Sequence, residues 1–377
     1  MKITKIETIP VNIPLTEKRY KSAEATDTRT KAGVYAETQR SVIVKIHTDE
    51  GIVGLGLSNP FVYYKESFET IVINIDKYFS KLLMGADPFN IDRIMVQMDE
   101  IIPDQPSSKN GVVTALYDIM GKALEVPICK LLGGCINEKI PAAQSIGFGC
   151  PEEVADRALK WKEKGVKAFK IKIGRPGDSG SMKDLKAVES IRDAVGPEVK
   201  LRVDANETYA YKIDVLRRME EYDLDLIEQP APRKDLVKMR RITQALDTPV
   251  LADQSIFSLQ DAIEVIKNEA ADVLMVKNYV IGGFYRAKQL LGLLETLHKA
   301  NYVEGGREPG IGTAATLHLA ASIAKVDYWG VLNGPLLLSD DLIQEPLEFK
   351  NGCWIVPMKP GLGVELDEER LKLRMIK

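Results

Sequence analysis

Histidine and cysteine are scarce in this chain, and both shortages narrow its chemistry. Three histidines and four cysteines occur among 377 residues. The cysteines are Cys129, Cys135, Cys150 and Cys353. Because they form no CxxC pair, we expect buried thiols in a reduced, cytoplasmic protein rather than a disulfide framework or a zinc site. The histidines are scattered, and the sequence contains no nucleophile-elbow pattern, so acyl transfer is not indicated.

The chain also lacks a long hydrophobic run and an excess of charge of one sign. No apolar stretch approaches the roughly 18 residues that a membrane span needs. The N-terminal stretch alternates charged with apolar residues, unlike a signal peptide. With 51 Lys+Arg against 54 Asp+Glu, the net charge is −3. We therefore expect a small-molecule substrate, and neither a nucleic-acid nor a membrane partner.

The length predicts more than one core. The hydrophobic and charged fractions, 45% and 28%, are ordinary for globular proteins. The 377 residues exceed the roughly 250–300 at which a single core stops growing. We predict an α+β domain over residues 1–130 and a catalytic domain over 131–333. A C-terminal segment over 334–377 is expected to pack back on the first domain.

The first 130 residues contain two kinds of periodicity. Residues 2–13 and 40–56 alternate apolar with polar side chains, as half-buried strands do. Helical periodicity follows at 66–83, 88–101 and 111–124. The last of these helices is apolar on most sides and is expected to be buried. Residues 16–31 are polar and have no apolar period, which predicts a mobile loop.

From about residue 139, short apolar runs alternate with longer amphipathic segments. The runs are Ile140–Ile146, Ala168–Ile173, Lys200–Val203, Leu226–Ile227, Val250–Ala252, Val273–Val276, Asn301–Val303 and Asp327–Leu332. The helical segments are 151–165, 182–194, 211–222, 233–246, 258–268, 283–299 and 313–324. This alternation predicts parallel βα units with right-handed crossovers. Short strands that are apolar on both faces favour a closed barrel over an open sheet.

Charged residues lie in or directly after five consecutive runs. Lys170 and Lys172 are two residues apart and therefore share one face of their strand. The next four runs are followed by Asp204, Glu228, Asp253 and Lys277. Catalytic residues of barrel enzymes gather at the carboxyl ends of the strands. The order lysine, three carboxylates, lysine therefore indicates an active site.

Three carboxylates around one axis would repel each other and raise their own pKa values unless a positive charge lay between them. A hard divalent cation is the simplest such charge. Oxygen ligands without histidine or cysteine indicate Mg²⁺, for which Mn²⁺ can substitute. Taken singly, an aspartate at a strand end is usually a helix cap or turn residue, and a lysine is usually solvated. The regular order on five successive strands favours the metal site.

These motifs resemble the enolase superfamily, and within it the muconate lactonizing enzyme (muconate cycloisomerase) subgroup. The resemblance is carried by Lys170-Ile171-Lys172, Asp204-Ala205-Asn206, Glu228-Gln229-Pro230, Ala252–Ser255, Lys277 with Gly282-Gly283, Gly111–Gly134 and Pro360–Gly363. It spans nearly the whole chain. It implies a modified (β/α)7β TIM-type barrel with an N-terminal α+β capping domain, and by analogy a homo-oligomer.

The resemblance also assigns roles to the strand-end residues. The implied Mg²⁺ ligands are Asp204, Glu228 and Asp253, with Asn206 behind them. Lys172 would be the base on one face of the substrate, with Lys170 lowering its pKa, and Lys277 the acid or base on the opposite face. A lysine of ordinary pKa, about 10.4, is protonated at neutral pH, so a base needs this lowering. Mg²⁺ would stabilise the enediolate that forms when a proton next to a carboxylate leaves.

Two departures from the family's pattern concern the substrate. Gln254 stands where the family usually has an acidic residue. In the segment 304–313, Glu308 matches a glutamate of the cycloisomerases, whereas Glu304 and Arg307 are additional charges. They indicate a polar or charged substrate group rather than muconate itself. The loop over 16–31, which is expected to close over the site and to engage a second anionic group, carries Lys18, Arg19, Tyr20 and Lys21.

Several functions remain open. The leading one is a Mg²⁺-dependent, muconate-cycloisomerase-like isomerase or lyase. An amino-acid or dipeptide racemase or epimerase would use both lysines, although the Asp-x-Asp pair typical of dipeptide epimerases is missing near residue 304. A dehydratase of a hydroxy acid or a hydroxyproline-like compound would share the mechanism. A non-catalytic barrel that binds a small acid would not need all five strand-end residues.

Overall fold

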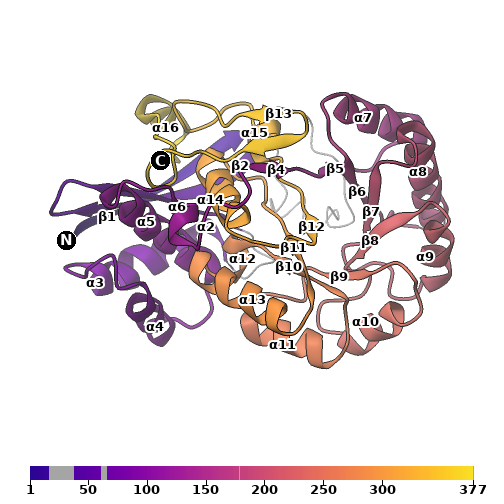
Figure 1. Ribbon diagram of the computed structural model, residues 1–377, viewed down its shortest axis with the longest axis horizontal. Coiled ribbons are helices and arrows are strands. Elements are labelled where there is room, and N and C mark those ends of the chain that lie inside the picture. The colour runs from indigo at the N-terminus through magenta and orange to yellow at the C-terminus, as the bar shows by residue number, and fades with distance from the viewer. Residues whose placement is uncertain (17–37, 61–65, 178, 377) are drawn as a thin grey trace.

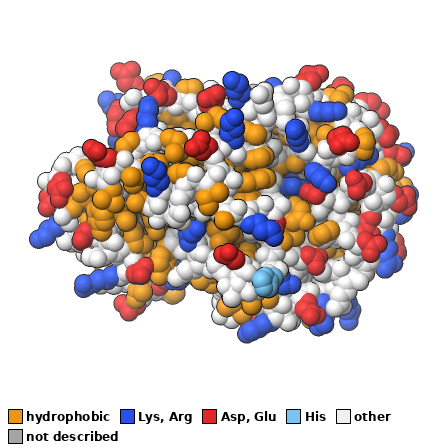
Figure 2. Space-filling view, in the orientation of Figure 1, with side chains coloured by type: hydrophobic (Ala, Val, Ile, Leu, Met, Phe, Trp, Pro, Cys, Tyr) orange, Lys and Arg blue, Asp and Glu red, His pale blue; other side chains and the backbone are white. Residues whose placement is uncertain are grey.

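A computed structural model describes residues 1–16, 38–60, 66–177 and 179–376 (Figure 1). Almost all of the predicted loop over 16–31, including Lys18, Arg19, Tyr20 and Lys21, lies outside the described residues. Figure 1 shows a curled sheet ringed by helices on one side and a smaller α+β layer on the other. Figure 2 shows basic, acidic and hydrophobic side chains interspersed over one face. Within the described ranges, no helix is both long and apolar enough to cross a membrane.

The N-terminal layer is an antiparallel meander covered by helices. Its strands are β1 (Ile3–Pro14), β2 (Thr38–Thr48) and β3 (Val53–Ser58), in the order β1-β2-β3. Its helical elements are α2 (Phe68–Ile73), η2 (Asn74–Phe79), α3 (Ser80–Leu83), α4 (Ile91–Ile101) and α5 (Pro106–Ala123). The predicted strands and helices are confirmed, except that a π-helical turn, η2, interrupts the helix expected over 66–83. The buried helix α5 begins at Pro106, a residue that suits a first turn.

Close contact between α5 and β3 depends on small residues. A Cβ atom on Gly56 would lie 1.9 Å from the carbonyl oxygen of Gly111, and one on Gly54 would lie 2.1 Å from that of Ala115. Because real Cβ atoms never approach backbone oxygens so closely, both strand positions require glycine. The helix can therefore lie directly on the sheet and fill the core of this layer.

The second layer is the predicted barrel. Its strands are β5 (Gln144–Ile146), β6 (Ala168–Lys172), β7 (Lys200–Asp204), β8 (Leu224–Glu228), β9 (Val250–Ala252), β10 (Val273–Val276), β11 (Ala300–Val303) and β12 (Tyr328–Trp329). They are parallel and neighbour each other in chain order. A parallel bridge between Ala143 and Val331 joins the first strand to the last. All eight predicted strands are confirmed, and the sheet closes as expected.

Helices connect the strands on the outside of the barrel. They are α7 (Pro151–Glu163), α8 (Gly180–Val195), α9 (Ile213–Glu220), α10 (Leu236–Thr243), α11 (Leu259–Lys267), α12 (Asn278–Ile281), α13 (Phe284–Thr296) and α14 (Gly310–Ala321). The seven predicted helices are among them. In α9, Leu216 and Met219 are buried, which is the one-sided pattern of a helix with a solvent face. In α14 every residue is buried.

The C-terminal residues contact both layers. Their elements are α15 (Gly334–Leu337), β13 (Phe349–Lys350), β14 (Cys353–Ile355) and α16 (Glu368–Arg374). Strand β14 pairs with β4 (Lys139–Pro141), just ahead of the barrel. The N–H of Leu362 donates to Asp118 Oδ1 on α5 over 2.7 Å, and that of Ile376 donates to the Pro10 carbonyl over 2.9 Å. The domain boundaries at 130/131 and 333/334 stay predictions.

The cysteines correct one expectation. Cys129, within the short helix α6 (Ile128–Leu131), forms a disulfide with Cys135, which follows the turn after that helix. The prediction of free buried thiols was therefore wrong for this pair. It was also wrong for Cys150, which is exposed, while Cys353 is half-buried. The pair is made possible because Gly133 and Gly134, both with positive φ, turn the chain back.

Candidate active site

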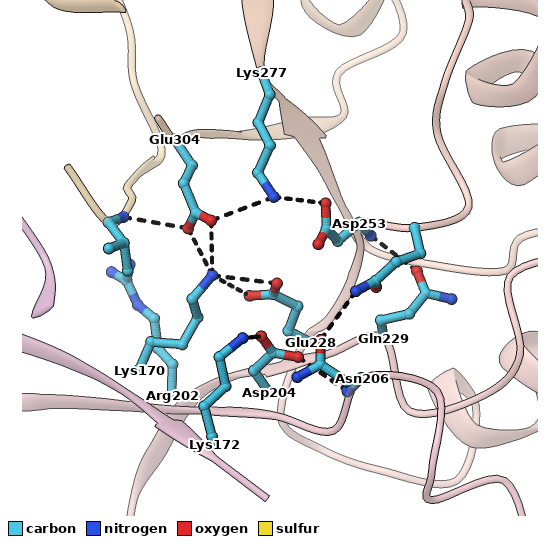
Figure 3. A network of polar contacts seen from close by, with 12 residues as sticks. Lys170, Lys172, Arg202, Asp204, Asn206, Glu228, Gln229, Asp253, Lys277 and Glu304 are labelled. Carbon is cyan, nitrogen blue, oxygen red and sulfur yellow. Dashed lines mark hydrogen bonds and ion pairs between the residues drawn. The ribbon is translucent and has the colours of Figure 1, made fainter. Parts of the chain in front are cut away.

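The charged residues of the five strand ends come together at the carboxyl end of the barrel (Figure 3). Strand register brings them there. Lys172 lies opposite Asp204 across β6 and β7, and Asp204 lies opposite Glu228 across β7 and β8. The side chains are buried, with exposed fractions of 1% for Asp204 and Glu228 and 5% for Lys277. The structure thus brings the side chains of the five strand ends together at one place, and the roles predicted for them stay predictions.

Each of the three carboxylates contacts a lysine. Lys172 pairs with Asp204. Lys170 Nζ lies 3.1 Å from Glu228 Oε2, and Lys277 Nζ donates to Asp253 Oδ1 over 2.8 Å. In Figure 3, Lys172 and Lys277 approach the group of carboxylates from opposite sides. The site therefore contains two amines that flank three acids, as two-sided proton transfer requires.

Glu304 belongs to the same network, which sequence reasoning missed. It follows β11 directly, and its Oε2 lies 2.7 Å from Lys170 Nζ while its Oε1 lies 3.3 Å from Lys277 Nζ. The sequence predicts that Glu304 is an extra charge facing the substrate. Instead, it is buried between two lysines. A charged residue directly after a short apolar run was the signal that identified Asp204, Glu228 and Asp253, and Glu304 carries it too.

The pKa shifts follow from burial and from these neighbours. Burial alone would raise the pKa of Asp204, but Lys172 and Lys170 outweigh it and lower that pKa. The pKa of Glu228 is raised well above its ordinary value, because burial and the charge of Asp204 oppose ionisation more than Lys170 favours it. Burial opposes the charged form of Lys170, yet Glu228 and Glu304 raise its pKa well above normal. Glu228 is thus the acid least well compensated by the protein itself.

The donor set fits a hard divalent cation. Glu228 Oε2 is buried and accepts no hydrogen bond, although Lys170 Nζ is close to it. The donors on β7, β8 and β9 are carboxylate oxygens, the ligands that Mg²⁺ prefers. In the part of the chain that the structure describes, no three acidic, histidine or cysteine side chains already form a metal-binding group. Each lysine contact occupies a carboxylate that a cation would take over.

Two loops, after β7 and after β8, adopt unusual backbone conformations. Asn206 and Glu207, after β7, have φ values of 45° and 69°, and Gln229, after β8, has a φ of 39°. Such left-handed conformations are uncommon for residues other than glycine and concentrate at functional sites. The turn after β7 is closed by a hydrogen bond of 3.0 Å from the Asn206 N–H to Asp204 Oδ1. This contact orients the first carboxylate.

Buried amides hold the remaining loops. Gln254 Nε2 donates to Asn206 Oδ1 over 3.0 Å, so the two predicted residues behind the carboxylates touch each other. Gln229, a second residue whose role the sequence did not reveal, accepts from the N–H groups of Asp253 and Ser255 at 3.0 and 3.2 Å. It therefore ties the end of β8 to the loop that carries Asp253.

Glu308 and Arg307 lie beside this network rather than in it. Glu308 is buried, accepts from the Gly306 N–H and the Thr316 hydroxyl, and leaves Oε1 without a hydrogen bond. Burial raises the pKa of Glu308 to about 7. Arg307 is half-buried and, among the described residues, forms no ion pair with these acids.

Comparison with known proteins identifies the family. The profile of the enolase C-terminal domain-like family matches residues 153–370, and that of the mandelate racemase/muconate lactonizing enzyme N-terminal domain matches residues 23–133. Muconate cycloisomerase 1 of Acinetobacter baylyi is 31% identical over 97% of this chain and 98% of its own length. The N-succinyl-L-Arg/Lys racemase of Bacillus cereus is 31% identical over 99% of this chain and 97% of its own.

A solved structure agrees with these sequence matches. Muconate lactonizing enzyme from Pseudomonas fluorescens, complexed with muconolactone, superimposes with a TM-score of 0.93 at 31% identity, over 100% of this chain and 99% of that one. The match covers the capping layer and the barrel together. This chain is therefore an enzyme of the mandelate racemase/muconate lactonizing enzyme family, within the enolase superfamily.

Proposed function

We propose that this enzyme uses Mg²⁺ to remove a proton from the carbon next to a substrate carboxylate, in an isomerase or lyase reaction of the muconate cycloisomerase type. Membership of the family implies a divalent metal ion. The observation that carries the proposal is the buried convergence of three acids and three lysines around Glu228, whose Oε2 accepts no hydrogen bond. Asp204, Glu228 and Asp253 would hold Mg²⁺, and Mn²⁺ could replace it.

Bound there, Mg²⁺ supplies positive charge that stabilises the enediolate form of the substrate. Lys172 lies on one side of the carboxylates and would take the proton. Asp204 now pairs with Lys172; with that carboxylate holding a cation instead, the Lys172 amine would be paired less strongly and could act as a base. Lys277 lies on the other side and would deliver a proton to the opposite face. Lys170, fixed between Glu228 and Glu304, would act as a permanent cation.

Other residues would position these groups. Asn206 and Gln254 hold each other behind the carboxylates and would keep Asp204 in place. Glu308 and Arg307, on the loop after β11, would contact the far part of the substrate. The substrate is accordingly a small carboxylate. A homo-oligomeric state and a cytoplasmic location remain predictions.

One observation favours a racemase or epimerase as the second candidate. Lys172 and Lys277 approach from opposite sides, so one could remove the α-proton and the other could return it to the opposite face (Figure 3). A dehydratase would use the same first step and expel a hydroxyl group instead. The racemase and dehydratase reactions begin with loss of the α-proton, and the cycloisomerase reaction passes through the same kind of enediolate, which gains a proton at that carbon to form the lactone, so one experiment tests their common step.

That experiment measures exchange of α-protons for deuterium by NMR. The purified protein is incubated in D₂O with Mg²⁺ or with EDTA, against muconates, N-acyl amino acids, dipeptides and proline derivatives. We expect exchange or turnover of at least one carboxylate with Mg²⁺ and none with EDTA. Loss of the reaction in Lys172→Ala, with normal Mg²⁺ binding, would support the assigned base. No metal-dependent exchange in any class would favour the non-catalytic, acid-binding barrel.

A further inference from the structure

Glu304 is a fourth carboxylate in the site, and the proposed reaction gives it no proton to carry. Its side chain is 7% exposed and contacts both Lys170 and Lys277. The N–H of Val331, from the chain after β12, donates to Glu304 Oε2 over 3.2 Å. The carboxylate is thus held by Lys170 of β6, by Lys277 directly after β10 and by the backbone just after β12.

The barrel has space for this residue because a glycine faces it. A Cβ atom on Gly330 would lie 2.6 Å from Glu304 Cβ and 2.6 Å from the Val303 carbonyl oxygen. Any larger residue at position 330 would push Glu304 away from the lysines. The two lysines, the Val331 N–H and the space left by Gly330 therefore together determine where Glu304 lies.

The charge of the site depends on Glu304. The ion pairs join three lysines, Lys170, Lys172 and Lys277, to four acids, Asp204, Glu228, Asp253 and Glu304. These three positive and four negative charges leave one negative charge. A divalent cation would change the sum to one positive charge, whereas without Glu304 it would be two. When Lys172 has lost its proton to act as the base, each of these sums is one charge lower.

Among the described residues, the other buried charges beside these ion pairs do not make this sum more positive. Arg202, the next buried cation, is balanced by Asp225, whose Oδ2 lies 2.8 Å from its Nε. Glu308 adds negative charge when it ionises, which acts in the same direction as Glu304. Because uncompensated buried charge is costly, the loaded site should accept one negative charge more readily than two.

We propose that Glu304 determines substrate charge, so that the site takes carboxylates with a single negative charge in the barrel mouth and disfavours dicarboxylates. This inference rests on the proposed function, because it assumes the divalent cation and the substrate carboxylate. It narrows the substrate class and assigns a residue to that selection.

Glu304 also acts as a positioning residue for the metal ligands. Lys170 divides its contacts between Glu228 and Glu304, and Lys277 divides its contacts between Asp253 and Glu304. Without Glu304, both lysines would pair more fully with the acids proposed to bind the cation. Removing Glu304 should therefore weaken cation binding, both through lost charge and through stronger competition.

The first test measures Mn²⁺ binding by calorimetry, without substrate. We expect Glu304→Gln to weaken Mn²⁺ binding about tenfold or more, equivalent to about 1.4 kcal/mol. Glu304→Asp, which keeps the charge, should recover part of this affinity. Asp225→Asn is the matched control, because it removes the same charge from a buried pair on the Arg202 side. It should change the affinity less than about twofold.

The second test compares two ligands of equal length, N-acetyl-L-glutamine and N-acetyl-L-glutamate, which differ by one negative charge. Binding to each Mn²⁺-loaded protein is measured by calorimetry. We expect the wild type to prefer the amide, and Glu304→Gln to reduce that preference about tenfold. Circular dichroism checks that each variant is folded.

The outcomes separate this inference from the proposed function. Unchanged Mn²⁺ affinity in folded Glu304→Gln overturns the inference, whether or not either probe ligand binds. Weaker Mn²⁺ binding with an unchanged ligand preference overturns the selection by charge. If the wild type binds Mn²⁺ and catalyses metal-dependent exchange in either case, the proposed function stands. If it binds no divalent cation, the proposed function fails and the inference fails with it.

Discussion

Replacing Lys277 by methionine should destabilise the metal-free protein more than replacing Lys172. Lys277 has a side chain that is 5% exposed, and its Nζ contacts Asp253 at 2.8 Å and Glu304 at 3.3 Å. Its loss leaves two buried acids with less positive charge. Removing one partner of a buried ion pair costs about 3–5 kcal/mol. We expect a loss of that size in the free energy of unfolding.

Lys172 offers the comparison. Its side chain is 19% exposed, and its partner Asp204 also accepts a hydrogen bond from the Asn206 N–H. The loss for Lys172→Met should therefore be about 1–3 kcal/mol. Lys200→Met is the surface control, because Lys200 is 63% exposed and lies 3.9 Å from Asp225. It should change stability by less than about 0.5 kcal/mol.

The assay is guanidinium unfolding followed by fluorescence, with EDTA and with Mg²⁺. Added Mg²⁺ should restore part of the loss in both site variants, because a bound cation compensates the same carboxylates. Both variants should lose α-proton exchange even where stability recovers. The reasoning would be refuted if folded Lys277→Met were as stable in EDTA as the wild type. Its ammonium would then not be what balances Asp253 and Glu304.

Two further predictions concern other buried groups. Burial lowers the pKa of His318 to about 4, so the folded state resists a proton that the unfolded chain binds below about pH 6.5. The contribution of His318 to the free energy of unfolding should be fully present above pH 6.5 and should fall by up to about 3 kcal/mol as the pH approaches 4. In denaturant titrations, His318→Gln should flatten this dependence of stability on pH. If the wild type and His318→Gln lost stability equally with falling pH, this prediction would be contradicted. Gln229→Ala should weaken Mn²⁺ binding by about tenfold in calorimetry, because the N–H groups of Asp253 and Ser255 lose their shared acceptor. An unchanged Mn²⁺ affinity would show that Gln229 positions no metal ligand.

Much of the barrel was predictable because its strands are short, apolar on both faces and separated by amphipathic helices. The run Val250–Ala252 was predicted with the bounds of β9, and the carboxylate directly after it, Asp253, was read correctly as a residue of the barrel mouth. Parallel strands place their carboxyl ends on one edge, so sequence order alone brought Asp204, Glu228 and Asp253 together.

The contacts of Glu304 and Gln229 were harder to predict from the sequence. Whether the glutamate faces the lysines or the substrate depends on space, and that space exists because Gly330 lies against it. Gln229 acts through an unusual backbone conformation, with φ at 39°, that a sequence pattern does not reveal.

The Cys129–Cys135 disulfide was missed for a similar reason. The two cysteines are six positions apart, and nothing in that spacing requires a bond. The pairing depends on the reversal at Gly133 and Gly134, where the chain after α6 turns back on itself. A chain reversal of this kind is set by backbone conformation, which the residue types permit but do not fix.

The central claim is that Asp204, Glu228 and Asp253 together hold one divalent cation. Anomalous diffraction from crystals grown with Mn²⁺ tests it most directly, since the metal is then located without reference to any substrate. The account predicts a single strong anomalous peak within about 2.0–2.4 Å of oxygens from all three carboxylates, with Lys172 and Lys277 on either side. A peak at another place would contradict this claim. So would a structure from Mn²⁺-containing crystals in which the three carboxylates bind no metal and still pair only with lysines.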